Sequence, residues 1–234
     1  MTLNSLDILD KYYADELGCS PHDLNNGQLI VVTSDHRDIR FAKGTPLPLF
    51  SLAQAGGAVI SVRPGLEEVV NAALCDANAA VLDDNACDAI ERKVSPLVNV
   101  RMWFRGNRLF CEPSFFTDQQ AGTVECITHT DEHARYLHSK WGGNVFGQIV
   151  NNTVVSWAAV KPLSNVAWDL SVETHPDYRG HGYAKSAVSA AVKFIFENSK
   201  LATWGTDRTN IASLNTARAL GFQDYALDFG CVEI

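Results

Sequence analysis

Several features that mark membrane, secreted or nucleic-acid-binding proteins are missing from this chain. No apolar run approaches the roughly 20 residues that a membrane span requires. The first residues also lack the basic region and apolar core of a signal peptide. No basic stripe is present that could follow a phosphate backbone, and the net charge is −8. We therefore expect a cytoplasmic protein with no membrane and no nucleic-acid partner.

Patterns that would indicate disulfides or a metal site are also missing. The six cysteines form no C-x-x-C pair, so we expect reduced and mostly buried thiols. His129 and His133 are four residues apart, but no H-E-x-x-H motif or third ligand accompanies them. We therefore expect no metal. With 234 residues, 46% of them hydrophobic, the chain is long enough for one large or two small domains with a sizeable core.

What the chain does contain is a strand, a glycine-bearing turn and a long amphipathic helix in succession. Residues 166–174 are typical of a strand, and the turn holds Gly180 and Gly182. Apolar residues at three- and four-residue spacing from Ala184 to Phe196 predict the helix. Glycines let a backbone approach a ligand, and the free N–H groups of a first helical turn favour a phosphate. We interpret the turn as a pyrophosphate cradle, with a plain strand–helix connection as the alternative.

The turn is not one of the common nucleotide-binding motifs. Lys185 stands three residues after Gly182, so G-x-G-x-x-G is not present, and neither is G-x-x-x-x-G-K-[ST]. The pattern Arg179-x-x-Gly182-x-Ala184 resembles instead the acyl-CoA signature [QR]-x-x-G-x-[GA] of the GNAT N-acetyltransferase superfamily.

Two further stretches strengthen this resemblance. Asn210-x-x-Ser213, followed by Leu-Gly-Phe at 220–222, is similar to the second motif of the family. Residues 172–184 resemble a branch that reads V-x-T-H-x-x-Y-[QR]-G-x-G-x-A and includes antibiotic-resistance acetyltransferases. The resemblance covers roughly residues 123–234.

The resemblance implies a GNAT fold for residues 123–234, an α/β (α+β) structure with a mixed, mostly antiparallel sheet flanked by helices. Residues 1–120 are expected to form an N-terminal α/β domain, with a diverged GNAT-like lobe as one option. The polar segment 117–122 is interpreted as the link between the two.

Periodicity and turn residues predict the individual elements. Hairpins are expected around Gly106-Asn107 and around Asn151-Asn152. The further helices are expected at residues 5–18, 66–77, 85–94, 131–140 and 210–220. The further strands are expected at residues 27–33, 48–53, 58–62, 98–104, 108–111, 124–127, 145–150, 154–160, 201–204 and 222–232.

The resemblance also implies the cofactor site. The strand ending at Thr174 would splay from its neighbour, so that the backbones of Val172 and Thr174 pair with the pantetheine amides of acetyl-CoA. A backbone N–H there would polarise the thioester carbonyl. Alternatively, Arg179 is a solvated surface cation, and Asn210 with Ser213 forms a helix cap. The implied cofactor-binding residues are Val172, Thr174, Arg179, Gly180, His181, Gly182, Tyr183, Ala184, Lys185, Asn210 and Ser213.

Glu173 and His175 are the candidate catalytic residues. An amine acceptor is mostly protonated at neutral pH, so a general base is needed before attack, and an imidazole or a partly desolvated carboxylate suits that task. Each could equally be a turn hydrogen-bonding or solvated surface group. Ala217 stands where many family members carry the tyrosine that protonates the leaving thiolate. The alternative donors, if a specific acid is needed at all, are Tyr178, Tyr183 and Tyr225.

The resemblance therefore predicts an N-acetyltransferase. It would move an acetyl group from acetyl-CoA to a primary amine, as in a small molecule, by direct attack in a ternary complex. One alternative is an acyltransferase with another acyl-CoA or acceptor, and a second is a non-catalytic acyl-CoA-binding regulatory module. The sequence leaves open the acceptor and the oligomeric state, with a homodimer among the options.

Overall fold

The structure of the chain, a computed structural model, describes residues 4–38, 40–41 and 45–234, so the first three residues of the N-terminal stretch tested for a signal peptide lie outside it. The chain forms two compact units, Met1–Asn107 with Tyr225–Ile234, and Arg108–Asp224. The division into domains 1–120 and 123–234 stays a prediction.

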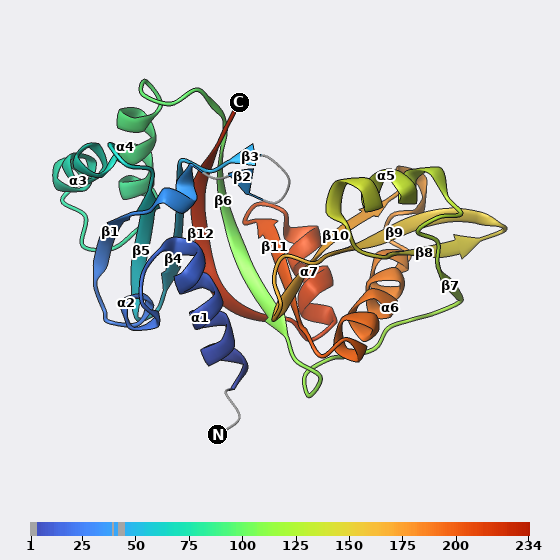
Figure 1. The fold of residues 1–234 in the computed structure, drawn as a ribbon. Coiled ribbons are helices and arrows are strands. Elements are labelled where there is room, and N and C mark those ends of the chain that lie inside the picture. Colours follow the sequence, from blue (N-terminus) through green and yellow to red (C-terminus); the bar gives the residue numbers. More distant parts are fainter. Residues whose placement is uncertain (1–3, 39, 42–44) are drawn as a thin grey trace. The chain divides into compact units, whose positions relative to one another are not determined.

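The N-terminal unit combines strands with helices that cover them (Figure 1). Parallel β1 and β5, then antiparallel β4 and β12, are neighbours in that order. Its core packs the apolar side of α3 and α4 against these strands, with Leu49, Ile60 and Ile90 fully buried. Its elements are α1 (Ser5–Leu17), α2 (Pro21–Leu24), β1 (Leu29–Thr33), η1 (Asp35–Arg37), β2 (Arg40–Phe41), β3 (Thr45–Pro46), β4 (Leu49–Gln54), β5 (Gly57–Val62), α3 (Glu67–Asp76), α4 (Asp84–Val94), most of β6 (Val100–Cys111) and most of β12 (Gln223–Glu233).

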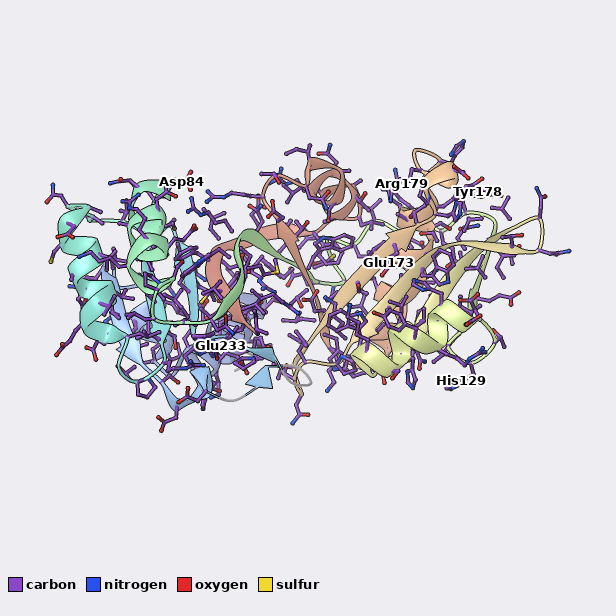
Figure 2. The ribbon with its side chains drawn as sticks, turned by 90° about the horizontal axis from the view of Figure 1, so that it is seen from above. Asp84, His129, Glu173, Tyr178, Arg179 and Glu233 are labelled. Carbon is purple, nitrogen blue, oxygen red and sulfur yellow. The ribbon has the colours of Figure 1, made fainter. Side chains whose placement is uncertain are left out.

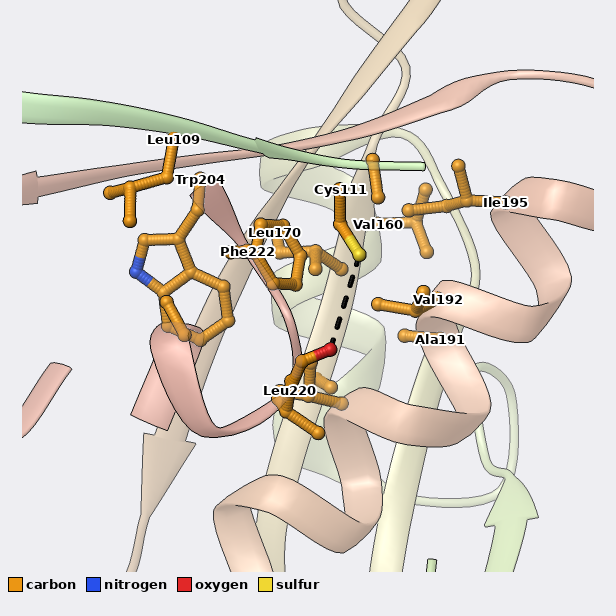
Figure 3. Close-up of a cluster of buried hydrophobic side chains, with 14 of the residues drawn as sticks. Leu109, Cys111, Val160, Leu170, Ala191, Val192, Ile195, Trp204, Leu220 and Phe222 are labelled. Atoms are coloured by element: carbon orange, nitrogen blue, oxygen red, sulfur yellow. Dashed lines mark hydrogen bonds between the residues drawn. The ribbon is translucent and has the colours of Figure 1, made fainter. Parts of the chain in front are cut away.

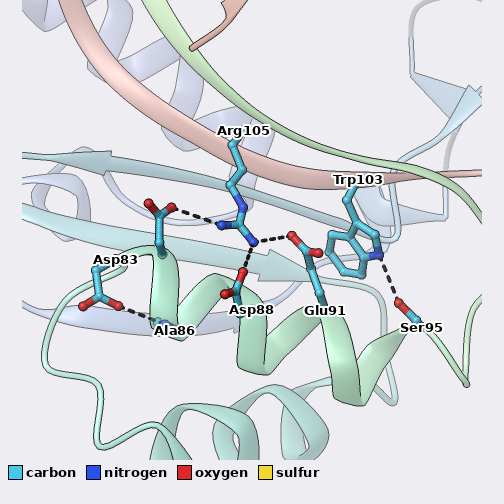
Figure 4. A network of polar contacts seen from close by, with 8 residues as sticks. Asp83, Ala86, Asp88, Glu91, Ser95, Trp103 and Arg105 are labelled. Carbon is cyan, nitrogen blue, oxygen red and sulfur yellow. Dashed lines mark hydrogen bonds and ion pairs between the residues drawn. The ribbon is translucent and has the colours of Figure 1, made fainter. Parts of the chain in front are cut away.

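A single arginine fastens α4 to β6 in this unit (Figure 4). The Arg105 guanidinium lies 3.1 Å from Asp84 and 2.5 Å from both Asp88 and Glu91. Burial acts against the charged form, but hydrogen bonds to Asp88 and Glu91 outweigh it and raise the pKa of Arg105. Because all three carboxylates lie along one side of α4, this network sets the position of the helix along the strand.

The hairpin expected around Gly106-Asn107 is wrong. Residues 100–111 form one continuous strand, β6. A two-residue hairpin turn requires positive φ angles, and neither Gly106 nor Asn107 has one. The second hairpin is confirmed: Asn151 and Asn152 have φ angles of 49° and 60° and join antiparallel β8 and β9.

The C-terminal unit has a mixed, mostly antiparallel set of strands in the order β11-β10-β9-β8-β7, in which only β10 and β11 are parallel. The predicted fold class of a mixed, mostly antiparallel sheet flanked by helices is confirmed (Figure 1). Its elements are β7 (Thr123–Cys126), α5 (Glu132–Trp141), β8 (Val145–Val150), β9 (Thr153–Lys161), β10 (Ala167–Thr174), η2 (Pro176–Tyr178), α6 (Tyr183–Glu197), β11 (Leu201–Asp207) and α7 (Ile211–Ala219).

Alternation along β9 separates the two faces of these strands. Ala158 and Val160 pack with the apolar stripe of α6 in the main core, which also contains Trp204 and Phe222 (Figure 3). Ala159, on the opposite face, packs with α5 in a smaller cluster. Since side chains of a strand point alternately to its two faces, each residue of β10 is assigned to the α5 or the α6 face by its partner on β9.

The segment interpreted as an interdomain link, 117–122, lies along α6. The backbone N–H groups of Gln119 and Ala121 each donate to a buried serine hydroxyl of α6, Ser189 and Ser186, at 2.9 Å. Polar residues on α6 therefore hold segment 117–122 in place. Its composition had indicated only a link.

Candidate functional site

The predicted site begins where β10 parts from β11. Pairing with β9 extends along β10 from Asp169 to Thr174. Pairing with β11 joins only Ala167, Trp168 and Asp169 to residues 201–203, and the described strands share no register beyond that point. The last five residues of β10 therefore have a sheet neighbour on one side only, as the resemblance implies.

The hydrogen-bonding direction of β10 decides which backbone groups face the gap. In an antiparallel pair, the N–H and C=O groups of one residue point to the same neighbour, and this direction alternates along the strand. His175 N–H donates to the Val155 carbonyl on β9 at 2.9 Å. Residues at even positions consequently face the other way, toward the β11 side. Val172 and Thr174, the two residues predicted to pair with pantetheine, are thus turned to the gap.

The turn after β10 has the conformation that its glycines allow. Gly180 and Gly182 have φ angles of 80° and 81°, which other residues rarely adopt. A Cβ atom at Gly180 would meet no described atom within 4 Å, and one at Gly182 would meet only the Lys185 side chain, at 3.9 Å. Crowding does not explain the glycines, so their role is the backbone conformation and an open surface above it.

Helix α6 begins in this turn without a side-chain cap. Gly182 is its N-cap residue and offers no side-chain acceptor, and no acidic residue lies in the first turn. The N–H groups of Tyr183, Ala184 and Lys185 belong to that first turn. Uncapped N–H groups at the positive end of a 15-residue helix attract anions. The local geometry suits a phosphate group.

Side chains of the turn contact the turn itself. Figure 2 marks Arg179 and Tyr178 beyond the strand that carries Glu173. The exposed Arg179 donates from Nε to the Thr174 carbonyl at 3.3 Å. A ring nitrogen of His181, Nδ1, lies 2.9 Å from the Arg179 carbonyl oxygen. These contacts stabilise the turn while the guanidinium stays at the surface beside the gap.

Asn210 and Ser213 form the helix cap that the sequence left as an alternative. The Asn210 side chain accepts from the Ser213 N–H at 3.1 Å and so caps α7. The Ser213 hydroxyl accepts from Trp204 Nε1 at 3.0 Å. A cofactor contact for either residue stays a prediction.

Many family members carry a tyrosine where this chain has Ala217, and one of the three alternative donors, Tyr225, is engaged in another contact. Ala217 is fully buried in the main core. The Tyr225 hydroxyl donates to Asp10 at 2.8 Å, and burial, followed by this hydrogen bond, raises its pKa. Tyr178 and Tyr183 remain in the turn, with ring centroids 6.4 Å apart.

The two catalytic candidates have different surroundings. Glu173 lies opposite Trp157, on the α5 face, and its Oε2 atom is 2.8 Å from Nε2 of His133. His175 accepts from the Asp177 N–H at 3.4 Å and caps η2, which is the turn role left open by the sequence. The side chains of Glu173 and His175 do not hydrogen-bond to each other in the structure; each has its own partner.

His133 is the residue that sequence reasoning missed. It precedes Glu173 by 40 residues, and its spacing to His129 pointed at most to a metal. Only the packing of α5 against β8 and β9, beside β10, brings it to Glu173. Among the described residues, no three His, Cys, Asp or Glu side chains are grouped to hold a metal ion. None of the helices in that part of the chain is long and apolar enough to span a membrane.

One family model and several solved structures are similar to this chain. The family model described as "Acetyltransferase (GNAT) family" matches residues 106–222, which is 117 of the 234 residues. A Drosophila protein structure is 13% identical with a TM-score of 0.50, over 98% of this chain and 88% of that one. A GNAT acetyltransferase from Colwellia psychrerythraea is 11% identical with a TM-score of 0.48, over 100% and 99%.

A third structure, yncA from Salmonella typhimurium with its cofactor acetyl-CoA, is 16% identical with a TM-score of 0.38, over 48% of this chain and 92% of that one. No curated protein matches. At these identities, the likeness to the Drosophila structure concerns the fold alone.

Proposed function

The chain belongs to the acetyltransferase (GNAT) family, and from this premise we propose that it is an N-acetyltransferase. It moves the acetyl group of acetyl-CoA to a primary amine of a small molecule, by direct attack in a ternary complex. As parts of the same proposal, the enzyme is cytoplasmic and acts without a metal, a membrane or a nucleic acid, and a homodimer is one option for its assembly. The similarity to antibiotic-resistance acetyltransferases leaves such an amine among the acceptors to test.

One observation carries the proposal. The unpaired side of β10 ends beside an open turn and an uncapped helix, so backbone groups without a strand partner and an anion-attracting helix terminus lie next to each other. Acetyl-CoA combines pantetheine amides, which suit the first, with a pyrophosphate, which suits the second. The residues present therefore fit the cofactor.

The residues of the chain take separate roles in this proposal. Val172 and Thr174 bind the pantetheine amides, and the first turn of α6 binds the pyrophosphate with Arg179 and Lys185 beside it. When bound, acetyl-CoA supplies the activated acetyl group. A backbone N–H near Thr174 polarises the carbonyl under attack, and Glu173 takes a proton from the acceptor ammonium group.

Two of the six cysteines, Cys111 and Cys231, are unsuited to form an acyl-enzyme. Cys111 is fully buried beside the Leu220 carbonyl (Figure 3), and burial raises the pKa of its thiol to about 12. Burial likewise raises the pKa of Cys231 to about 12. A thiol that stays protonated is a poor nucleophile.

The second candidate is a binding module without catalytic activity. Ala217 favours it, because this buried alanine of α7 cannot supply an acid. Coenzyme A thiolate is a tolerable leaving group near neutral pH, so we place this candidate second. A further alternative is transfer of another acyl group or to a hydroxyl acceptor.

Thiol release separates these proposals. Acetyl-CoA is incubated with a panel of small amines, amino acids and aminoglycosides, and free coenzyme A is measured with a thiol-reactive dye. Amine-dependent release supports the enzyme. Binding of acetyl-CoA without release for any acceptor supports the module, and absence of binding contradicts both. Longer acyl-CoA donors and alcohol acceptors in the same assay test the remaining alternative.

A further inference from the structure

A histidine and a glutamate from different elements meet on the α5 face. His133 is the second residue of α5, and Glu173 is the penultimate residue of β10. Their Nε2 and Oε2 atoms are 2.8 Å apart, with side-chain exposures of 38% and 47%. Both groups are therefore accessible from solvent while they contact each other.

The His133 ring is held on two sides by aromatic rings. Trp157 meets it edge to face, with centroids 5.0 Å apart and an interplanar angle of 77°. Tyr136, one turn along α5, stacks on it at 5.8 Å and 27°. Two rings in different orientations leave the imidazole little freedom to rotate.

The support extends to the cap of α5. The Trp157 Nε1–H donates to Asp131 at 2.9 Å, and the same carboxylate oxygen caps α5 by accepting from the Ala134 N–H at 2.8 Å. Trp157 is also the direct cross-strand partner of Glu173. The position of His133 relative to Glu173 thus follows from the sheet register and the helix cap together.

The contact uses one carboxylate oxygen of Glu173. Within the described part of the chain, Oε1 has no hydrogen-bond partner, whereas Oε2 is taken by His133. An exposed glutamate ordinarily samples several rotamers, so a fixed donor on one oxygen selects the orientation of the other.

We propose that His133 is a positioning residue for Glu173. In the tautomer with a proton on Nε2, it donates to Oε2 and directs the free Oε1 to the acceptor amine. The proposal rests on the proposed function, in which Glu173 is the base, and it adds the element that orients this base. When a catalytic group must be held in productive geometry, removing the residue that orients it lowers the rate of the reaction.

Two variants separate the hydrogen bond from the packing. His133→Phe keeps an aromatic ring between Trp157 and Tyr136 but removes the donor. His133→Gln supplies an amide N–H in place of Nε2–H. His129→Gln is the matched control, because His129 is exposed and its ring meets that of His138 edge to face rather than contacting Glu173.

We expect His133→Phe to lower kcat by 10- to 100-fold with an unchanged KM for acetyl-CoA. His133→Gln should recover the rate to within about threefold of the wild type, and His129→Gln should equal it. Full activity of His133→Phe overturns the proposal, and so does a His133→Gln variant as slow as His133→Phe, since the hydrogen bond would then not be what matters.

Crystal structures of the wild type and of His133→Phe provide a readout that does not depend on turnover. Glu173 should occupy one rotamer in the wild type and a different rotamer, or several, in the variant. If the wild type transfers no acetyl group but Glu173 responds in this way, the proposed function fails while the positioning contact stands. An unchanged Glu173 rotamer in His133→Phe overturns the positioning role.

Discussion

A negative charge placed in the turn at Gly182 tests the phosphate cradle directly. In Gly182→Asp, the new Cβ meets only the end of the Lys185 side chain, so the substitution fits sterically. The φ angle of 81° costs an L-residue about 1 kcal/mol. A carboxylate at the N-terminus of α6 returns about 0.3–1 kcal/mol through the helix dipole. The fold should therefore survive.

The affinity of Gly182→Asp for acetyl-CoA should fall strongly. Two unit negative charges about 5 Å apart repel by about 3 kcal/mol at an effective dielectric constant of about 20. Since each 1.4 kcal/mol changes affinity by about tenfold, the Kd for acetyl-CoA should rise by roughly 100-fold or more. Gly182→Asn is the matched control, because it has the same size and backbone strain without the charge.

Isothermal titration calorimetry of both variants provides the measurement, with circular dichroism to verify folding. We expect Gly182→Asn to bind acetyl-CoA within about tenfold of the wild type and Gly182→Asp to bind it roughly 100-fold or more weakly than the wild type. The difference should shrink with dephosphorylated pantetheine derivatives, which lack the pyrophosphate. Equal affinities of the two variants for acetyl-CoA would refute the reasoning, because no anion could then lie at the turn.

Four further predictions concern the cofactor, the proposed base, the buried Ala217 and the Arg105 network. Acetyl-CoA at a hundredfold excess over its Kd should stabilise the fold by about 2.7 kcal/mol, seen as a rise in Tm, and no response to millimolar ligand would contradict the cofactor assignment. Glu173→Gln should lower kcat/KM by roughly 10²–10⁴-fold with little change in the KM for acetyl-CoA, because the amide cannot accept a proton. His175→Ala is its control, and a loss of rate in His175→Ala alone would identify His175 as the base. Ala217→Tyr should destabilise the chain by about 1–3 kcal/mol in urea denaturation without raising kcat, because the side chain would overpack the core rather than supply an acid. Arg105→Met should cost about 1–3 kcal/mol of stability by removing the ion pairs with Asp84, Asp88 and Glu91, whereas Arg101→Met at an exposed position should change it by less than about 0.5 kcal/mol.

Local features of this protein could be predicted from the sequence because they depend on neighbouring residues. The glycines at 180 and 182 indicated positive φ angles beside a helix start, and both angles are positive. The Asn151-Asn152 turn was recognised for the same reason. The spacing of Asn210 and Ser213 allowed a helix cap as the alternative to a cofactor contact, and the Asn210 side chain does cap α7. In each case a backbone conformation or a short-range hydrogen bond restricts which residues fit.

Features that depend on strand register and helix packing were decided by the tertiary structure alone. Gly106-Asn107 has the composition of a turn, yet its neighbours continue as a strand because extended backbone is compatible with both residues. Nothing in the spacing of His133 indicates Glu173, since their contact requires α5 to pack on the face of β8 and β9 to which Glu173 also belongs. Which backbone amides face the gap likewise follows from the β9 register, because a shift of one residue would turn Val172 and Thr174 the other way. The motif residues could thus be named from the sequence, whereas the direction in which they face and the partners they meet come from pairings between distant segments.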